Sequence, residues 1–300
     1  MPRVSRPWAT TERLSIIRIG VTALKKKLSC LRCAALLGTA AVLTPLAMLF
    51  PGGSTKRQRA PFQGMNFAHR GLHSRDKTVP ENSLEAFRLA ARAGYGIELD
   101  VRLSRDGQVV VFHDNDLKRV CGVDKRVDEL DWAELRQLKL CGTEHGIPLF
   151  SDALDVIRGR GPLIVELKNG PRNRELCEKT YALLAQYRGD VCIESFSPFI
   201  VGWFRLHGRD LLRGQLATLS RDYIRDGIRL PTAFLLSHCL LNFVGRPQFI
   251  AYRIGYRPPT VRLAELFGAL RFGWTSHEPR NEKGRDGVIF EFYKPRIRFK

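Results

Sequence analysis

The sequence predicts an α/β protein, a (β/α)8 barrel of the TIM-barrel type that follows one N-terminal transmembrane helix. Three observations lead to this prediction. Short apolar runs alternate with helical stretches from Asn66 onward, which is typical of a mainly parallel sheet. About eight such strands fit a closed barrel, whose usual size is ~250 residues. An uncharged run that ends at Phe50 is long enough to cross a bilayer. An open, doubly wound sheet is the alternative for the main domain.

The N-terminal region is basic and then apolar. The first 60 residues hold eleven Lys and Arg against a single acid, Glu12. No charge occurs from Cys33 to Phe50, and a helix of ~20 residues spans the hydrocarbon layer. We expect a single-pass anchor at residues 33–52, with a cleaved signal peptide or a soluble core helix as alternatives. The basic flank is heavier before this run than after it, which favours a main domain outside the cytoplasm.

The chain therefore divides into a basic N-terminal segment (residues 1–32), the transmembrane helix (33–52), a linker (53–65), the barrel domain (66–294) and a basic tail (295–300). The tail is either a solvated basic end or a contact for acidic lipid. We expect a membrane partner through the single span, no nucleic-acid partner and no obligate protein partner. Neither an aromatic-basic motif nor a recognised nucleic-acid module occurs in the sequence.

The strands and helices follow from periodicity and from turn residues. Asn82 or Ser83 caps a helix that ends at Gly94, and Asp106-Gly107 forms a hairpin-type turn between two strands. The expected strands are Asn66–Gly71, Gly96–Leu103, Val109–His113, Pro162–Asn169, Val191–Phe196, Leu211–Ala217, Phe249–Ile254, Arg271–Thr275 and Gly287–Phe292. The expected helices after Gly94 are Trp132–Leu138, Ser151–Arg158, Arg174–Tyr187 and Thr260–Leu270. The apolar stretch Phe234–Val244 is expected to be an outer helix of the barrel, or alternatively to rest on the bilayer.

Several kinds of site are excluded by missing motifs. The seven cysteines are scattered and contain no paired CxxC motifs, so neither a zinc site nor a disulfide framework is expected. The cysteines of the barrel domain look unpaired, which argues mildly for a reducing compartment. Neither Gly-rich phosphate loop, GxGxxG or GxxxxGK[ST], occurs, and GxSxG is also missing.

A cluster of carboxylates is expected at the ends of two strands. Glu98 and Asp100 are two residues apart, so they lie on the same face of a strand, ~6.6 Å apart at the backbone. Glu166 and Lys168 repeat this spacing on a later strand. If the strands are neighbours, three carboxylates converge, and an all-oxygen site suits Mg²⁺ or Ca²⁺. Strand-end salt bridges, for example between Glu166 and Lys168, are the alternative.

Two histidines end other apolar runs. His69 and His113 fit a general acid and a general base near neutral pH, and Arg70 and Lys168 fit the binding of an anion. Together with a metal, these groups suit phosphoryl chemistry. Asp114 either orients His113 or simply ends the strand, and the same alternatives hold for Asp116.

The order of these motifs resembles the glycerophosphodiester phosphodiesterase family, within the phosphatidylinositol-phosphodiesterase-like TIM-barrel superfamily. The resemblance rests on His69-Arg70-Gly71, Pro80-Glu81-Asn82-Ser83, Ile97-Glu98-Leu99-Asp100-Val101, Asp106-Gly107, His113-Asp114, Glu166-Leu167-Lys168, Ser195-Phe196, Trp274-Thr275 and Asp286-Gly287-Val288-Ile289. It implies a (β/α) barrel with a divalent cation and a phosphodiester substrate that carries glycerol on one side.

The resemblance also implies a role for each site residue. Glu98, Asp100 and Glu166 match the metal ligands; His69 and His113 match the catalytic acid/base pair; Arg70 and Lys168 match the phosphate-binding cations. Trp274 matches an aromatic of the substrate pocket, with a core tryptophan as the alternative. Glu81 matches an acid that contacts the metal, supports the groups that do, or caps the next helix.

Two departures from the family pattern concern the pocket rim: Ser276-His277 after Trp274-Thr275, and Phe290-Glu291 in place of a usual Thr-Asp. They leave the alcohol head group open. The expected activity is metal-dependent hydrolysis of glycerophosphodiesters to sn-glycerol 3-phosphate and an alcohol. The alternatives are a lysophospholipase D-like enzyme that acts on membrane lysolipids and a non-catalytic lipid-binding barrel.

Overall fold

The computed structural model describes residues 46–300 of the chain. Residues 48–300 form one compact unit, and every element named below belongs to it. No helix within residues 46–300 is both long enough and apolar enough to cross a membrane. Most of the predicted span at residues 33–52 lies outside the described residues, so the membrane anchor stays a prediction.

Eight parallel strands close into a barrel in the described part of the chain. The sheet order is β1-β9-β8-β7-β6-β5-β4-β2, and β1 pairs with both β9 and β2. This closure rules out the open sheet. A ninth strand, β3, pairs antiparallel with β2 outside the ring. The strands are β1 (Met65–Ala68), β2 (Gly96–Leu103), β3 (Val109–Val111), β4 (Leu163–Leu167), β5 (Val191–Ser195), β6 (Leu212–Ala217), β7 (Phe249–Arg253), β8 (Leu270–Ser276) and β9 (Gly287–Phe290).

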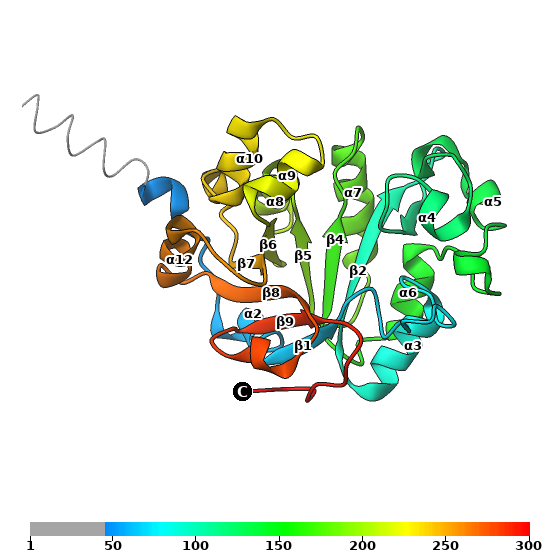
Figure 1. Cartoon of the computed structure of the whole chain (residues 1–300), viewed down its shortest axis with the longest axis horizontal. Coiled ribbons are helices and arrows are strands. Elements are labelled where there is room, and N and C mark those ends of the chain that lie inside the picture. The colour runs from blue at the N-terminus through cyan, green and yellow to red at the C-terminus, as the bar shows by residue number, and fades with distance from the viewer. Residues whose placement is uncertain (1–45) are drawn as a thin grey trace, which may run out of the picture. The chain divides into compact units, whose positions relative to one another are not determined.

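Helices surround the strands (Figure 1). They are α2 (Lys56–Arg59), α3 (Leu84–Ala93), α4 (Lys118–Cys121), α5 (Trp132–Leu135), α6 (Phe150–Ile157), α7 (Asn173–Leu184), α8 (Pro198–His207), α9 (Ser220–Arg225), α10 (Leu230–Ser237), α11 (Asn242–Gly245) and α12 (Pro259–Leu266). Ser83 is the N-cap of α3, since its Oγ accepts from the Ala86 N–H at 3.1 Å. The expected single helix Phe234–Val244 is instead divided between α10 and α11.

Phenylalanine rings fill the lower half of the barrel, at the amino ends of the strands. Phe67, Phe249 and Phe272 are fully buried there and pack on one another with ring centroids 4.6–5.8 Å apart. Glycines on the strands make room for them, because a Cβ at Gly96 or Gly214 would overlap with a ring. The lower half is therefore a closed, apolar plug.

The segments that flank the barrel in sequence also pack on this lower half. Residues 53–65, predicted as a linker, include α2 and place the Phe62 side chain, 2% exposed, in the inner core. The tail, residues 295–300, runs beneath β1 and β9 (Figure 1), where Phe299 N–H donates to the Gly64 carbonyl at 2.8 Å. The Lys300 ammonium also pairs with Asp286 at 2.6 Å.

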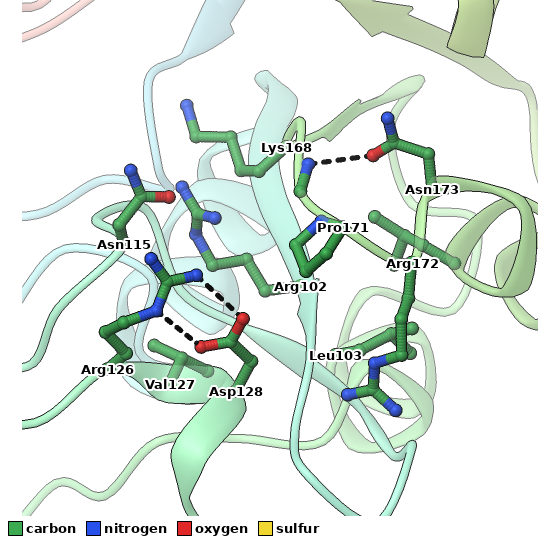
Figure 2. Close-up of a pocket in the computed structure, with 12 residues that line it drawn as sticks. Arg102, Leu103, Asn115, Arg126, Val127, Asp128, Lys168, Pro171, Arg172 and Asn173 are labelled. Atoms are coloured by element: carbon green, nitrogen blue, oxygen red, sulfur yellow. Dashed lines mark hydrogen bonds and ion pairs between the residues drawn. The ribbon is translucent and has the colours of Figure 1, made fainter.

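Residues 113–149 form a lobe beside the opposite, carboxyl end of the strands. Its core contains Leu117, Val127 and Leu135, which are buried against Val110 and Phe112. A small hollow of about 40 Å³, open to solvent, lies where this lobe meets the carboxyl ends of β2 and β4 (Figure 2). The fold thus leaves the carboxyl end of the barrel open and polar.

Candidate active site

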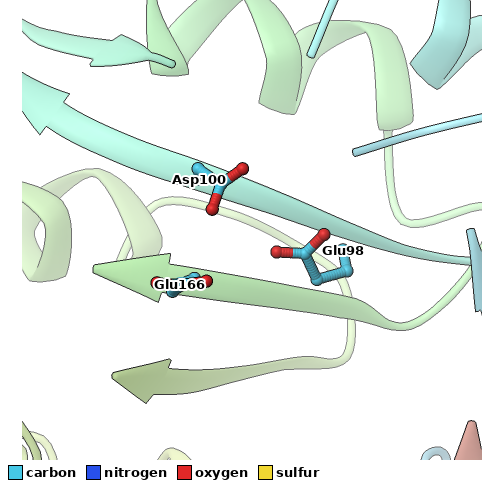
Figure 3. A group of neighbouring side chains, drawn as sticks. All are labelled: Glu98, Asp100 and Glu166. Carbon is cyan, nitrogen blue, oxygen red and sulfur yellow. The ribbon is translucent and has the colours of Figure 1, made fainter. Parts of the chain in front are cut away.

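Three buried carboxylates converge inside the upper half of the barrel, at the carboxyl ends of the strands. Glu98 and Asp100 point inward from β2, and Glu166 points inward from the neighbouring strand β4 (Figure 3). One oxygen of each lies within 4.8 Å of the others. All three side chains are at most 9% exposed. The spacing on β2 and the pairing of the two strands together produce the convergence that the sequence predicts.

Lys168 and Asn82 partly compensate this cluster. The Lys168 Nζ lies 2.9 Å from Asp100 Oδ1 and 2.7 Å from Glu166 Oε1, and the Asn82 amide donates to Asp100 Oδ2 at 2.8 Å. Burial would raise the pKa of Asp100, but Lys168, His113 and Arg70 hold it well below its usual range. Asp100 is therefore the carboxylate of the cluster that stays charged.

The negative charges of Glu98 and Glu166 are only partly balanced by nearby cations. Burial, Asp100 and Glu166 raise the pKa of Glu98 well above its usual value. Burial also raises the pKa of Glu166 to about 7, against the opposing charge of Lys168. A buried cluster that resists full ionisation is relieved by a cation. Three carboxylates with oxygen-only donors fit Mg²⁺ or Ca²⁺, and these three residues would hold it.

His69 follows β1 and is oriented by Glu291, which follows β9. The His69 Nδ1 lies 3.0 Å from Glu291 Oε2, and its Nε2 points toward Glu98 Oε2 at 4.0 Å. Burial and the charge of Arg70 lower the pKa of His69, although Glu291 opposes this shift. The ring is therefore neutral near pH 7 and is able to accept a proton. Glu291 is one of the two departures from the family pattern, and sequence reasoning did not foresee this contact.

His113 lies on the other side of the cluster and is oriented by Asp114. Its Nδ1 is 2.6 Å from Asp114 Oδ1. Burial and the nearby ammonium of Lys168 lower the pKa of His113 to about 4. Asp116 does not take part, because its carboxylate accepts from the Lys118 N–H at 3.0 Å. Of the two candidate orienting acids, the structure selects Asp114.

Glu81 lies behind Arg70 and does not belong to the carboxylate cluster. It accepts from Arg70 Nη1 at 2.7 Å and from both terminal nitrogens of Arg119 at 2.9 and 2.6 Å. Burial opposes its ionisation, but Arg119 and Arg70 lower the pKa of Glu81 to about 2. Arg119 also donates to Asp114 at 2.6 Å. A continuous chain of ion pairs thus joins Arg70 to the carboxylate that orients His113.

Arg70 itself contacts the cluster directly. Its backbone N–H donates to Glu98 Oε2 at 2.9 Å, and its Nε lies 3.5 Å from Asp100 Oδ2. The residue has a positive φ of 54°, a conformation that turns the chain sharply after β1. Arg70 and Lys168 therefore reach the carboxylates from two sides.

Trp274 lies at the mouth of the barrel, partly buried on β8. Its Nε1 donates to the Ala251 carbonyl at 2.9 Å, and its ring meets Phe196 edge to face with centroids 5.6 Å apart. Both rings pack on the inner core. A core contact and a pocket wall are both consistent with this position, so a role in substrate binding stays a prediction.

Glu194 is a fourth acid that sequence reasoning missed. It is 1% exposed on β5, opposite Glu166 on the neighbouring strand. Among the described residues, no donor contacts its Oε2. Burial and the charges of Glu98 and Glu166 raise the pKa of Glu194 well above its usual value, which favours its protonated form. The available signal was the alternation along β5, which puts Glu194 on the same inner face as buried Cys192.

Comparison with known proteins shows the family of this chain. The model of the glycerophosphoryl diester phosphodiesterase family matches residues 69–190. A putative glycerophosphodiester phosphodiesterase of Bacillus subtilis, YhdW, is 32% identical over 190 residues, which cover 58% of this chain and 76% of that protein. The chain belongs to the glycerophosphoryl diester phosphodiesterase family.

Other relatives of this family share smaller parts of the chain. The rat lysophospholipase D GDPD1 is 30% identical over 165 residues, about half of each protein. The first curated relatives that the chain matches are covered over about a third to a half of their own length. An Oleispira antarctica phosphodiesterase, solved in complex with the product sn-glycerol-3-phosphate, has the same fold, with a TM-score of 0.61 and 22% identity over 76% of this chain and 93% of that one.

Proposed function

We propose that this protein is a metal-dependent glycerophosphodiester phosphodiesterase. It would hydrolyse deacylated phospholipids to sn-glycerol 3-phosphate and an alcohol. The observation that carries the proposal is the convergence of Glu98, Asp100 and Glu166 within 4.8 Å, between the cations Arg70 and Lys168. Family membership and the product named for the Oleispira structure support the same substrate class.

Each group of site residues has its own proposed role in phosphodiester cleavage. Arg70 and Lys168 would hold the nonbridging phosphate oxygens, Arg70 as a fork and Lys168 as a point charge. A bound Mg²⁺ or Ca²⁺ would supply Lewis-acid stabilisation of the charge that develops on those oxygens. One of His69 and His113, each held by a carboxylate, would in its neutral form remove a proton from the attacking hydroxyl. The other, protonated once the anionic diester binds beside it, would give a proton to the leaving alcohol.

An assay of the full chain tests the proposal. We expect hydrolysis of glycerophosphocholine or glycerophosphoethanolamine with Mg²⁺ or Ca²⁺ present, and loss of activity after treatment with a chelator. Metal-independent activity, or full activity in Glu98→Ala or His69→Ala, would contradict it.

A second candidate is a lysophospholipase D-like activity on lysolipids. The similarity to the rat lysophospholipase D GDPD1 favours it, and so does the uncharged run from Cys33 to Phe50. Comparing lysophosphatidylcholine with glycerophosphocholine separates the candidates, because a lysophospholipase D would prefer the lipid. The same run supports a single-pass membrane protein, and the heavier basic flank before the run supports an extracytoplasmic catalytic domain. A topology reporter fused after Lys300 tests this placement.

A further inference from the structure

The charged side chains that line the hollow beside the carboxylate cluster are mainly basic. Its titratable lining residues are the four cations Arg102, Arg126, Lys168 and Arg172 and a single acid, Asp128. Lys168 belongs both to this lining and to the carboxylate cluster, so the hollow adjoins the place where the phosphate is proposed to bind. Figure 2 shows the polar ends of Lys168, Arg102 and Arg126 gathered on one side of the hollow.

Arg102 is the unbalanced charge in this lining. It lies two residues beyond Asp100 on β2, on the same inward face as Glu98 and Asp100. Its Nε and Nη2 donate to the His113 carbonyl at 3.0 and 2.8 Å. Within residues 46–300, no carboxylate lies within ion-pair distance of its guanidinium, which is partly buried. A partly buried guanidinium without a carboxylate partner is stabilised by an anion.

The other charges around the hollow are paired. Lys168 contacts Asp100 and Glu166, and Arg126 forms a fork with Asp128 at 2.8 and 2.7 Å. Arg172 points away, toward the carbonyls of Ser104 and Arg105 and toward Glu175 (Figure 2). Arg126 uses Nε and Nη2 for this fork, and Arg102 uses Nε and Nη2 for the His113 carbonyl. Among the described residues, neither Nη1 atom has a hydrogen-bond partner. Two guanidinium donors are therefore open to a ligand.

We propose that this hollow binds an anionic substituent, a carboxylate or a second phosphate, on the alcohol half of the glycerophosphodiester. The inference rests on the proposed function and names its preferred substrates, namely diesters whose alcohol carries a negative charge. Arg102, which lines the hollow, lies two residues, ~6.6 Å at the backbone, beyond Asp100 on β2, so a group bound beside it would be joined to the phosphate through a short alcohol. Arg102 also contacts the His113 carbonyl, so the alcohol would leave on the side of the cluster where His113 lies. A cationic choline would be repelled by Arg102 and gain nothing from Arg126.

Two matched substrate pairs test the inference. Glycerophosphoserine differs from glycerophosphoethanolamine by one carboxylate, and glycerophosphoinositol 4-phosphate differs from glycerophosphoinositol by one phosphate. Hydrogen bonds to charged groups typically change binding by about tenfold or more. We expect kcat/KM to favour the anionic member of at least one pair about tenfold, and the pair that shows it identifies the anion. Equal kcat/KM values within both pairs would overturn the inference.

Variants separate anion binding from a structural role. Arg126→Met is the main variant because Arg126 is exposed and its loss should leave the fold intact. We expect the preference ratio to fall severalfold in Arg126→Met and further in Arg102→Met. Arg136→Met is the matched control, since Arg136 is an exposed arginine of the same lobe outside the hollow, and its ratio should equal that of the wild type. If Arg102 and Arg126 have only a structural role, each substitution should lower kcat/KM equally for both substrates of a pair and leave the preference ratio unchanged.

Calorimetric binding of the same pairs, with chelator present and no turnover, keeps the inference distinct from the proposed function. Selective binding of the anionic member that is lost in Arg126→Met supports the hollow even if no diester is hydrolysed. Hydrolysis of all four diesters without selectivity supports the proposed function and contradicts the binding of an anionic substituent in the hollow.

Discussion

The lower and upper halves of the barrel interior are formed by the same eight strands but contain opposite chemistry. The lower half holds stacked rings such as Phe67 and Phe272. The upper half holds buried charges such as Glu98, Asp100 and Lys168, whose proximity raises or lowers one another's pKa values. Burying apolar rings stabilises a fold, whereas burying incompletely paired charges destabilises it. The contrast indicates that the lower half supports the fold and the upper half is kept for function.

The largest effect is expected from the upper half. Glu98→Gln should lower kcat/KM at least ~10³-fold, because it removes a proposed metal ligand and electrostatic stabilisation is usually the largest catalytic contribution. The free energy of unfolding should change little or rise, since a carboxylate with a raised pKa is removed. Steady-state kinetics and urea unfolding measure the two quantities. Glu129→Gln, an exposed glutamate of the lobe, is the control, and a loss below tenfold in Glu98→Gln would sink the proposed role.

The lower half should respond in the opposite way. Phe272→Ala removes a fully buried ring that packs on Phe67 and Phe249, so the free energy of unfolding should fall by ~3–5 kcal/mol. The kcat/KM of the protein that remains folded should stay within about threefold of the wild type. Phe199→Ala is the matched control, because Phe199 is 71% exposed and should cost less than ~0.5 kcal/mol. Equal costs at the two positions would remove the distinction between the halves.

A smaller effect is expected from the chain of ion pairs that joins Arg70, through Glu81 and Arg119, to the Asp114 carboxylate beside His113. Arg119→Met breaks the link from Glu81 to Asp114, so kcat/KM should fall ~10-fold as His113 and Arg70 lose their orientation. The loss should not add to that of Glu81→Gln in a double-mutant cycle. Lys118→Met, which removes an exposed neighbouring cation, should have no effect. Additive losses would show that the chain does not act as a unit.

The last prediction concerns the pH dependence of stability. The pKa of His113 is about 4 in the folded protein, below the ~6.5 of an unfolded chain. Between these values the unfolded state binds the proton and the folded state does not, so folding is destabilised as the pH falls from about 6.5 toward 4. His113→Gln should flatten this limb of stability against pH by up to ~1.4 kcal/mol per pH unit. Thermal unfolding of both proteins from pH 7 to 4 measures it, and parallel curves would contradict the lowered pKa.

Much of the barrel could be predicted because each strand is a short apolar run bounded by turn residues. The bounds of Gly96–Leu103 agree to the residue, and the other predicted strands overlap those observed. The convergence of Glu98, Asp100 and Glu166 followed from period-two spacing on neighbouring strands. By contrast, the apolar composition of Phe234–Val244 concealed the turn between α10 and α11, because hydrophobicity alone does not locate a helix end.

The contacts that the sequence did not predict join residues far apart in the chain or placed by loops. Glu291 reaches His69 across 222 positions of sequence because β9 pairs with β1. Arg119 contacts Glu81 and Asp114 only because the lobe folds back onto the strand ends. Asn82 looks like a helix cap in sequence, but its positive φ of 57° turns its amide toward Asp100. Such contacts arise from loops whose positions no local pattern specifies.

Binding of a divalent cation to the three carboxylates tests the central claim most directly. Unfolding of the full chain should be measured with Mg²⁺ and with Ca²⁺, in the wild type and in Glu98→Gln. A cation at 100 times its Kd should raise the free energy of unfolding of the wild type by ~2.7 kcal/mol, and Glu98→Gln should lose most of that gain. An unchanged wild type, or equal stabilisation of both proteins, would contradict a metal site at Glu98, Asp100 and Glu166.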